Sequence, residues 1–188
     1  NEKFINYGLE LLRRIINNSF DNEYFPKTRS IRQLNFYLKY FVLVRELLKE
    51  SFNDIPEYLD EMIFYLGKSY AVFSKLEQSL LFNGNHQNDL SEFNKYLAHF
   101  KYKFENSNNE IGGYAILKNK NSILAMDVGN SPQKGFSYNY QSGALSFEFF
   151  YKDKKLISNS GYFQDYKNKL NLISKSTAAQ STLVIDNH

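Results

Sequence analysis

The sequence has no cysteine, no tryptophan, and only three prolines and nine glycines in 188 residues. Without cysteine, the chain cannot form disulfide bonds, thiolate metal sites or a cysteine nucleophile. Its three histidines, His86, His99 and His188, are too scattered to indicate a metal site by spacing. No apolar run approaches the roughly 18 residues that a membrane span requires. Asn1 leads straight into a helical pattern without the features of a signal peptide, so we expect a fragment of a longer protein.

The sequence also has no block of residues that carry the same charge. The 23 basic and 20 acidic residues are spread along the chain and give a formal net charge of +3, so no nucleic-acid or membrane surface is expected. The glycines at 112, 113 and 129 do not open a helix after a strand, which argues against nucleotide binding. What the chain does have is 43% hydrophobic and 17% aromatic residues, enough to bury a sizeable core.

The first half of the chain has helical periodicity. Apolar residues recur at helical spacing over residues 4–16 and again over residues 34–48, where Ser30 is available as the N-cap. Asp54, three residues before Glu57, indicates the start of a third helix. A short fourth helix is expected after a loop, with Asp89 and Glu92 as capping residues. The sequence therefore predicts an α-helical segment over residues 1–105.

The second half changes to short β-prone runs. Residues 114–117 and 122–126 flank a polar turn and predict a hairpin, and residues 144–151 alternate as a strand should. Two further strands are expected at residues 155–158 and 181–185. Together these patterns predict an α+β fold, with an antiparallel β-domain over residues 111–188 that is truncated at its C-terminal end.

Three segments of the second half resemble the β-domain of the heparinase II/III family. They are residues 135–148, which contain Gly-Ala-Leu-Ser-Phe-Glu, residues 156–161, Leu-Ile-Ser-Asn-Ser-Gly, and residues 176–183, Ser-Thr-Ala-Ala-Gln-Ser-Thr-Leu. Residues 21–30 also resemble the segment that joins late helices of the family's α-barrel. The resemblance implies the end of an α/α barrel-type domain followed by the start of a β-sandwich-type domain, both incomplete.

The resemblance also implies an activity. Family members cleave acidic, uronate-containing polysaccharides, including glycosaminoglycans, by β-elimination, in which a base takes the proton next to the carboxylate and an acid protonates the leaving oxygen. Tyr and His transfer the protons, the β-domain often holds a structural zinc, and many members are periplasmic. An acidic polysaccharide is therefore the implied partner, with no nucleic acid and no membrane; the oligomeric state and the compartment of this protein stay open.

The family's functional residues are changed at four positions of this sequence. Asn139 stands where the resemblance implies the catalytic His, and an amide does not titrate near neutral pH. The implied zinc ligands correspond to Gln141, Asn159 and Gln180, which are poor ligands beside imidazole or carboxylate. The sequence therefore predicts that the zinc site is lost and that no metal is bound.

The replacements allow two interpretations each. Gln141, Asn159 and Gln180 either hydrogen-bond one another to preserve strand packing, or form a substrate-binding amide cluster. The candidate catalytic residues are Asn139 with its neighbours Tyr138 and Tyr140, whose phenols could act as acid or base or could simply pack. Two hypotheses follow: a polysaccharide lyase of doubtful catalytic competence, or a non-catalytic glycan-binding or structural relative that has lost the metal and the catalytic His.

Overall fold

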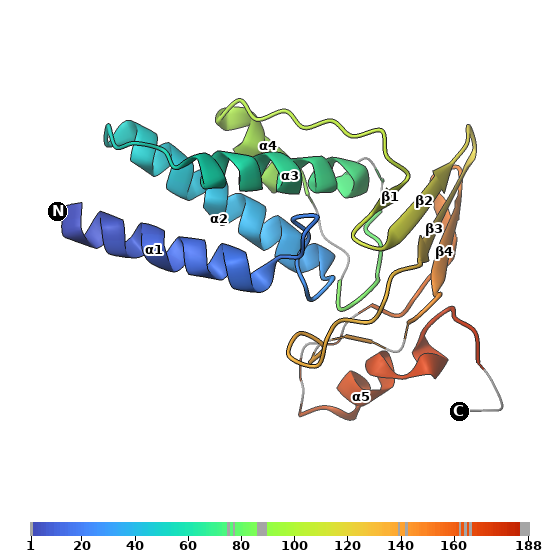
Figure 1. The fold of residues 1–188 in the computed structure, drawn as a ribbon. Helices are drawn as coiled ribbons and strands as arrows, with labels where there is room; N and C mark the ends of the chain where they lie inside the picture. Colours follow the sequence, from blue (N-terminus) through green and yellow to red (C-terminus); the bar gives the residue numbers. More distant parts are fainter. Residues whose placement is uncertain are drawn as a thin grey trace.

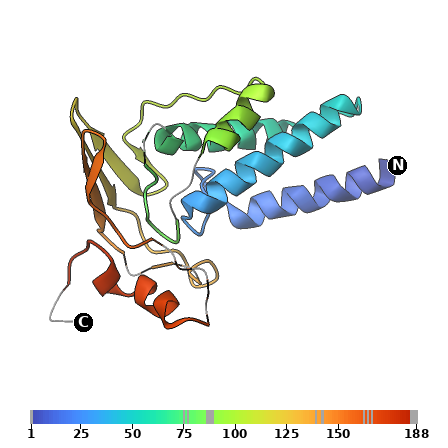
Figure 2. The ribbon, with the colours of Figure 1, turned by 180° about the vertical axis from the view of Figure 1, so that it is seen from behind.

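The computed structural model describes residues 2–74, 76, 78–85, 90–138, 140, 141, 143–161, 163, 165 and 167–184. Helices come first and a sheet follows, as the sequence predicts. The helices are α1 (Glu2–Ser19), α2 (Ile31–Glu50), α3 (Glu57–Ser74) and α4 (Ser91–His99). Figures 1 and 2 show α1, α2 and α3 lying side by side and pointing away from the sheet, with the N-terminus at the far end.

Local signals explain where the helices begin. The Ser30 hydroxyl accepts a hydrogen bond from Gln33 N at 3.3 Å, so the predicted N-cap of α2 is confirmed. Helix α3 begins at Glu57, directly after Pro56, slightly later than the pattern of Asp54 and Glu57 predicts. Helix α4 follows Leu90, which makes no side-chain cap bond. The predicted cap Asp89 lies outside the described residues.

Five antiparallel strands form one sheet within the described residues, in the order β1-β2-β3-β4-β5. They are β1 (Glu110–Ile111), β2 (Tyr114–Lys118), β3 (Ser122–Asp127), β4 (Phe147–Tyr151) and β5 (Lys154–Ile157). Tyr114 pairs with Asp127 across the β2–β3 hairpin, which confirms the hairpin predicted from the sequence. The face of β4 that carries Glu148 and Phe150 is buried, so this strand turns a carboxylate inward.

Two strand predictions need correction. Residues 144–146 form a turn, with Leu145 in the left-handed region at φ 59°, so the strand begins only at Phe147. Residues 181–184 are not a strand either, although Phe147 N donates to Ser181 O at 3.1 Å. The hydroxyls of Ser181 and Thr182 bond to the carbonyls of Phe147 and Ala144, so side chains replace much of the expected backbone ladder. Residue 185 lies outside the described residues.

Two short helical turns near the C-terminal end were not predicted from the sequence. These are α5 (Lys169–Lys175), drawn below the sheet in Figure 1, and the 3₁₀ turn η1 (Thr177–Ala179). Asn168 caps α5, because its Oδ1 accepts a hydrogen bond from Leu170 N at 3.0 Å. No helix among the described residues is long and apolar enough to span a membrane.

The core is continuous from the helices into the sheet. Buried side chains of α2 and α3 join Phe25 and Phe82, which contact Tyr114 of β2 through ring centroids 6.3 and 5.4 Å apart. Helix α1 is different, since none of its described residues is buried and Phe4 is 73% exposed. The two halves of the chain therefore share one core at their junction, and the candidate site lies at the same place.

Candidate functional site

Arg29 joins the loop before α2 to the sheet. Its guanidinium donates to Asp127 Oδ1 at 2.6 Å and is largely buried. It also donates to four backbone carbonyls, those of Gly112, Gly113, Gly129 and Asn130. A Cβ on Gly113 or Gly129 would lie only 2.6 Å from Arg29 Nη2, so the planar cation fits because these positions are glycine. The glycines thus serve the junction between helices and sheet.

Tyr114 and Asn83 complete this polar cluster. The Tyr114 ring is fully buried, its hydroxyl donates to Arg29 O at 2.5 Å, and the Arg29 guanidinium lies 4.9 Å from the ring centroid. Asn83 Nδ2 donates to the Tyr114 hydroxyl and lies 3.5 Å from Asp127 Oδ2. Burial raises the pKa of Tyr114 and also that of Asp127, where Arg29 opposes the rise. These residues form a buried polar network between the two halves of the chain.

A small pocket of about 170 Å³ lies at this junction. The N-terminal end of α2, the loop of residues 83–84 and the loop of residues 135–140 all reach it. Its lining includes Ser30, Arg32, Gln33, Asn83, Tyr138 and Tyr140. It therefore brings together the helical segment that resembles the family's barrel and the loop that resembles its β-domain.

Both predicted tyrosines line the pocket, in different environments. Tyr138 is 83% exposed, and Lys175 Nζ lies 5.3 Å from its ring centroid. The Tyr140 hydroxyl is buried and has no hydrogen bond of good geometry within the described residues. Burial, followed by the charge of Asp127, raises the pKa of Tyr140. The third predicted catalytic residue, Asn139, lies outside the described residues.

The three amides predicted at the former zinc positions each bond to a different partner. Gln141 is 1% exposed; its Oε1 accepts from Gly84 N at 3.3 Å and its Nε2 donates to Gly161 O at 2.7 Å. Asn159 is 3% exposed, and its Oδ1 accepts from Ser181 N at 2.9 Å. Gln180 is half-buried and donates to Ser174 O at 2.9 Å. These contacts hold loops together, whereas a role in sugar binding stays a prediction.

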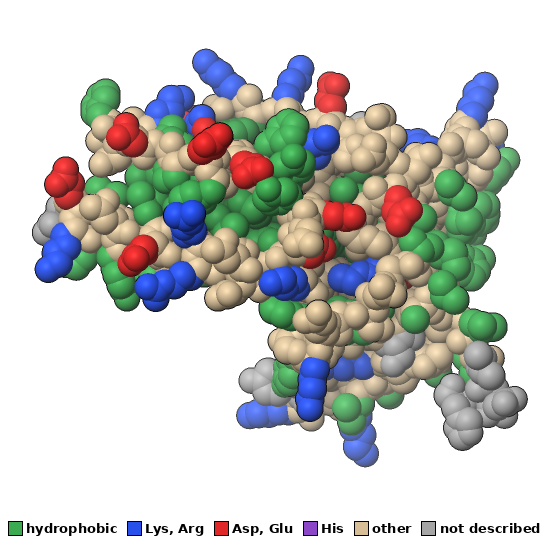
Figure 3. Space-filling view, in the orientation of Figure 1, with side chains coloured by type: hydrophobic (Ala, Val, Ile, Leu, Met, Phe, Trp, Pro, Cys, Tyr) green, Lys and Arg blue, Asp and Glu red, His purple; other side chains and the backbone are tan. Residues whose placement is uncertain are grey.

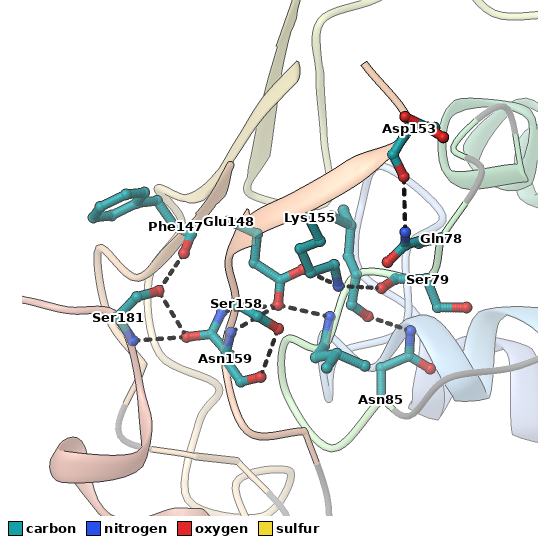
Figure 4. A network of polar contacts seen from close by, with 12 residues as sticks. Gln78, Ser79, Asn85, Phe147, Glu148, Asp153, Lys155, Ser158, Asn159 and Ser181 are labelled. Carbon is teal, nitrogen blue, oxygen red and sulfur yellow. Dashed lines mark hydrogen bonds and ion pairs between the residues drawn. The ribbon is translucent and has the colours of Figure 1, made fainter. Parts of the chain in front are cut away.

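Glu148 is the centre of a buried network that Figure 4 shows from close by. Its fully buried carboxylate pairs with Lys155 Nζ at 2.7 Å and accepts hydrogen bonds from Leu81 N and Asn159 N, each at 3.1 Å. Asn159 Nδ2 adds a further bond to the same carboxylate at 3.2 Å. Lys155 Nζ also donates to Ser79 O at 2.7 Å. The network links β4, β5, the loop of residues 79–81 and the segment near residue 181.

The amide positions do not fit the structural zinc that the family resemblance implies. Zinc prefers thiolate, imidazole and carboxylate ligands, but the Gln141 oxygen and the Asn159 oxygen both accept backbone N–H groups instead. Among the described residues, no group of three or more His, Cys, Asp or Glu side chains could hold a metal ion.

Two ion pairs, Arg29–Asp127 and Lys155–Glu148, were not predicted from the sequence. Each pair crosses between segments whose proximity depends on tertiary structure or on hairpin register. A weak signal existed for the second pair, because Glu148 alternates with aromatic residues in a strand and Lys155 follows it across a short turn. For the first pair, 98 residues separate the partners, and no local pattern joins them.

The chain is similar to known proteins in part of its sequence and in its fold. Residues 107–188 match the family model described as heparinase II/III-like, C-terminal. Among solved structures, heparinase III has a TM-score of 0.79 at 15% identity, with 100% of this chain and 36% of that chain covered. The heparan sulfate lyase HepC from Pedobacter heparinus has a TM-score of 0.75 at 17% identity, with 96% and 33% covered.

The sequence identity and the coverage determine what these similarities show. At such low identity the solved structures establish the fold, and the chain spans about one third of their length. No curated protein sequence matches the chain significantly. The two comparisons point the same way: residues 107–188 match the heparinase II/III-like C-terminal family model, and the fold of the chain is similar to that of the solved heparinase III structures.

Proposed function

We propose that the heparinase II/III-like protein represented by this chain acts on an acidic, uronate-containing polysaccharide, and that the sugar binds in the junction pocket. The observation that carries the proposal is the convergence of Arg32, Tyr138 and Tyr140 on that pocket. A guanidinium pairs well with a uronate carboxylate, and tyrosine rings suit the apolar faces of sugars. The solved structures of similar fold include a heparan sulfate lyase.

The same residues can be assigned roles in β-elimination. In this proposal Arg32, which lines the pocket, neutralises the substrate carboxylate, and this makes the neighbouring proton easier to remove. Tyr140, whose pKa is raised by burial and by Asp127, stays protonated at neutral pH and is suited to protonate the leaving oxygen. Tyr138, the other phenol that lines the pocket, is the candidate base that takes the proton from the sugar carbon beside the carboxylate. Asn139 stays a candidate for contact with the reacting sugar.

We further propose that the β-segment folds without zinc, because the amides at Gln141, Asn159 and Gln180 are used in internal hydrogen bonds. We also propose residues 1–105 and 111–188 as two domains that pack on each other through the shared core at their junction, the first being the end of an α/α barrel-type domain. The exposed apolar side of α1 supports this, since it offers a surface for further helices.

The test uses the full-length protein with heparin, heparan sulfate, alginate and ulvan-type glycans. A lyase generates an unsaturated uronate that absorbs in the ultraviolet. We expect product from at least one of these polymers. Tyr140→Phe should reduce the rate of product formation by about two orders of magnitude, because a general acid typically contributes about that factor to the rate. Tyr7→Phe on α1, a tyrosine that is 59% exposed, is the matched control and should leave the rate unchanged.

A second candidate function, non-catalytic binding of acidic glycan, is favoured by the amides in place of titratable groups at positions 141, 159 and 180. Binding of a uronate oligosaccharide that Tyr138→Ala or Arg32→Gln weakens, with no product from any polymer, would establish this candidate and reject the lyase. Absence of both product and binding would overturn the proposed function in either form.

A further inference from the structure

A second hollow, of about 350 Å³, lies at the far ends of the strands from the junction pocket. The β2–β3 turn, the β4–β5 turn and Leu76 line it. Strand β2 runs from Tyr114, at the junction, to Lys118, at this hollow. A strand of this length spans roughly 15 Å, so the two concavities are distinct places on the molecule.

The hollow is basic. Lys118, Lys120 and Lys152 line it, together with the amides of Asn119 and Asn121, against a single acidic side chain, that of Asp153. All three lysines are exposed, and none forms an ion pair within the described residues. In Figure 3 a basic side chain projects at the upper right end of the molecule, where Figure 1 shows the turn between β2 and β3.

Backbone contacts fix the two turns against each other. Lys152 N donates to Asn121 O at 2.5 Å, which ties the β4–β5 turn to the β2–β3 turn. Gln78 Nε2 donates to Asp153 O at 3.0 Å, as Figure 4 shows, and so anchors the β4–β5 turn to the segment after α3. The lysines therefore extend from turns that are already ordered, which lowers the entropy cost of binding a ligand.

We propose that this basic hollow, the turn-end hollow, is a secondary binding site for an acidic polysaccharide, separate from the junction pocket. Three ammonium groups and two side-chain amides around one concavity suit the sulfate and carboxylate groups that repeat along such a chain. Contact at two places strengthens the hold on a long polymer more than on a short oligosaccharide. The inference rests on the proposed function, since it takes an acidic glycan as the ligand.

The test compares four forms of the full-length protein, the wild type and three variants, on immobilised heparin and in solution binding to heparin. The triple variant Lys118→Gln/Lys120→Gln/Lys152→Gln should bind long heparin roughly tenfold more weakly, because each exposed charge contributes roughly twofold to the affinity. The matched control, Lys3→Gln/Lys39→Gln/Lys103→Gln, removes three exposed lysines of the helical half and should change affinity by less than about twofold. Asp153→Asn should strengthen binding, because it removes the acidic side chain from the hollow.

Further probes separate this inference from the proposed function. Hyaluronan, which carries carboxylates without sulfate, should bind more weakly than heparin, and neutral dextran should not bind. A uronate disaccharide should bind the triple variant as well as the wild type, because it occupies only the junction pocket. If the two triple variants lose equal affinity for heparin, or neither loses any, the turn-end hollow is not a site, whatever the disaccharide does. If heparin binding depends on the three lysines while no uronate glycan binds at Tyr138 and Tyr140, the proposed function is rejected, whereas the turn-end hollow is supported as a binding site.

Discussion

At the scale of single residues, Glu148 is the clearest case of a charge balanced inside the fold. A fully buried carboxylate is costly unless it is paired and hydrogen-bonded. Glu148 has Lys155 as its counter-ion and three N–H groups, those of Leu81 N, Asn159 N and Asn159 Nδ2, as donors. The loops that meet here are therefore held by polar contacts, which depend on each partner being present.

Lys155→Met should lower the free energy of unfolding by about 3 kcal/mol or more, because it leaves the Glu148 carboxylate buried without its counter-ion. Urea unfolding of the purified full-length protein measures the loss. The exposed neighbour Lys154→Met is the control and should change stability by less than about 0.5 kcal/mol. Adding Glu148→Gln to Lys155→Met should recover part of the loss; equal stability of the two single lysine variants would contradict the prediction.

Arg29 gives a second prediction at this scale. Arg29→Lys keeps the positive charge but cannot reach Asp127 and four carbonyls at once, since only the planar guanidinium presents donors in several directions. We expect a loss of about 2 kcal/mol or more, with donors and acceptors left unpaired in the junction. Arg14→Lys, at a position where the side chain is 67% exposed, should be close to neutral in the same unfolding assay. An equal effect of the two substitutions would show that Arg29 acts through charge alone.

At the scale of elements, two helical glycines provide a matched pair. A Cβ on Gly67 of α3 would lie 2.1 Å from ring atoms of Phe104, whereas a Cβ on Gly8 of α1 would meet nothing within 4 Å. Gly67→Ala should therefore destabilise the protein by about 1–3 kcal/mol through overpacking. Gly8→Ala should stabilise it by about 0.5–1 kcal/mol through helix propensity. Thermal unfolding followed by circular dichroism measures both, and a shift of the same sign for both would contradict the packing argument.

The elements also show how far the sequence predicts this fold. Helical periodicity and the Ser30 cap were enough to place α2, and the polar turn at 119–121 was enough for the β2–β3 hairpin, because those signals are local. The prediction of a strand was wrong for the described residues 181–184, because Ser181 and Thr182 form hydrogen bonds through their hydroxyls. Strand propensity does not take such side-chain bonds into account.

The candidate site was likewise predicted only in part from the sequence. Motif order located the loop with Tyr138 and Tyr140, and both line the junction pocket. The sequence could not supply Arg32 as their neighbour, nor the Arg29–Asp127 pair below the pocket, because those contacts join residues about 100 positions apart. Long-range polar pairs of this kind follow from tertiary packing and leave no periodic pattern.

At the scale of the whole molecule, buried tyrosines couple stability to alkaline pH. Burial raises the pKa of Tyr70 from 10.0 to about 12, and its hydroxyl donates to Asn94 Oδ1 at 2.7 Å. Burial raises the pKa of other tyrosines in the same direction; these are Tyr58, Tyr96, Tyr102, Tyr114 and Tyr140. They are distributed over both halves of the chain, so the effect belongs to the common core.

The sign of this linkage follows from which state releases its proton first. Below pH 10 the phenols are protonated in both states, and the stability that the protonated folded form contributes is fully present. Between 10 and about 12 the unfolded chain ionises at Tyr70 while the folded protein does not, so the free energy of unfolding falls as pH rises.

Tyr70→Phe should be less stable at neutral pH, because it loses the bond to Asn94, yet its stability should fall less steeply over that range. Urea unfolding at neutral pH and at several values between 10 and 12 measures both slopes. Tyr7→Phe, at a position that is 59% exposed, is the control and should follow the wild-type slope. Parallel slopes for the wild type and Tyr70→Phe would mean that Tyr70 ionises alike in the folded and unfolded states.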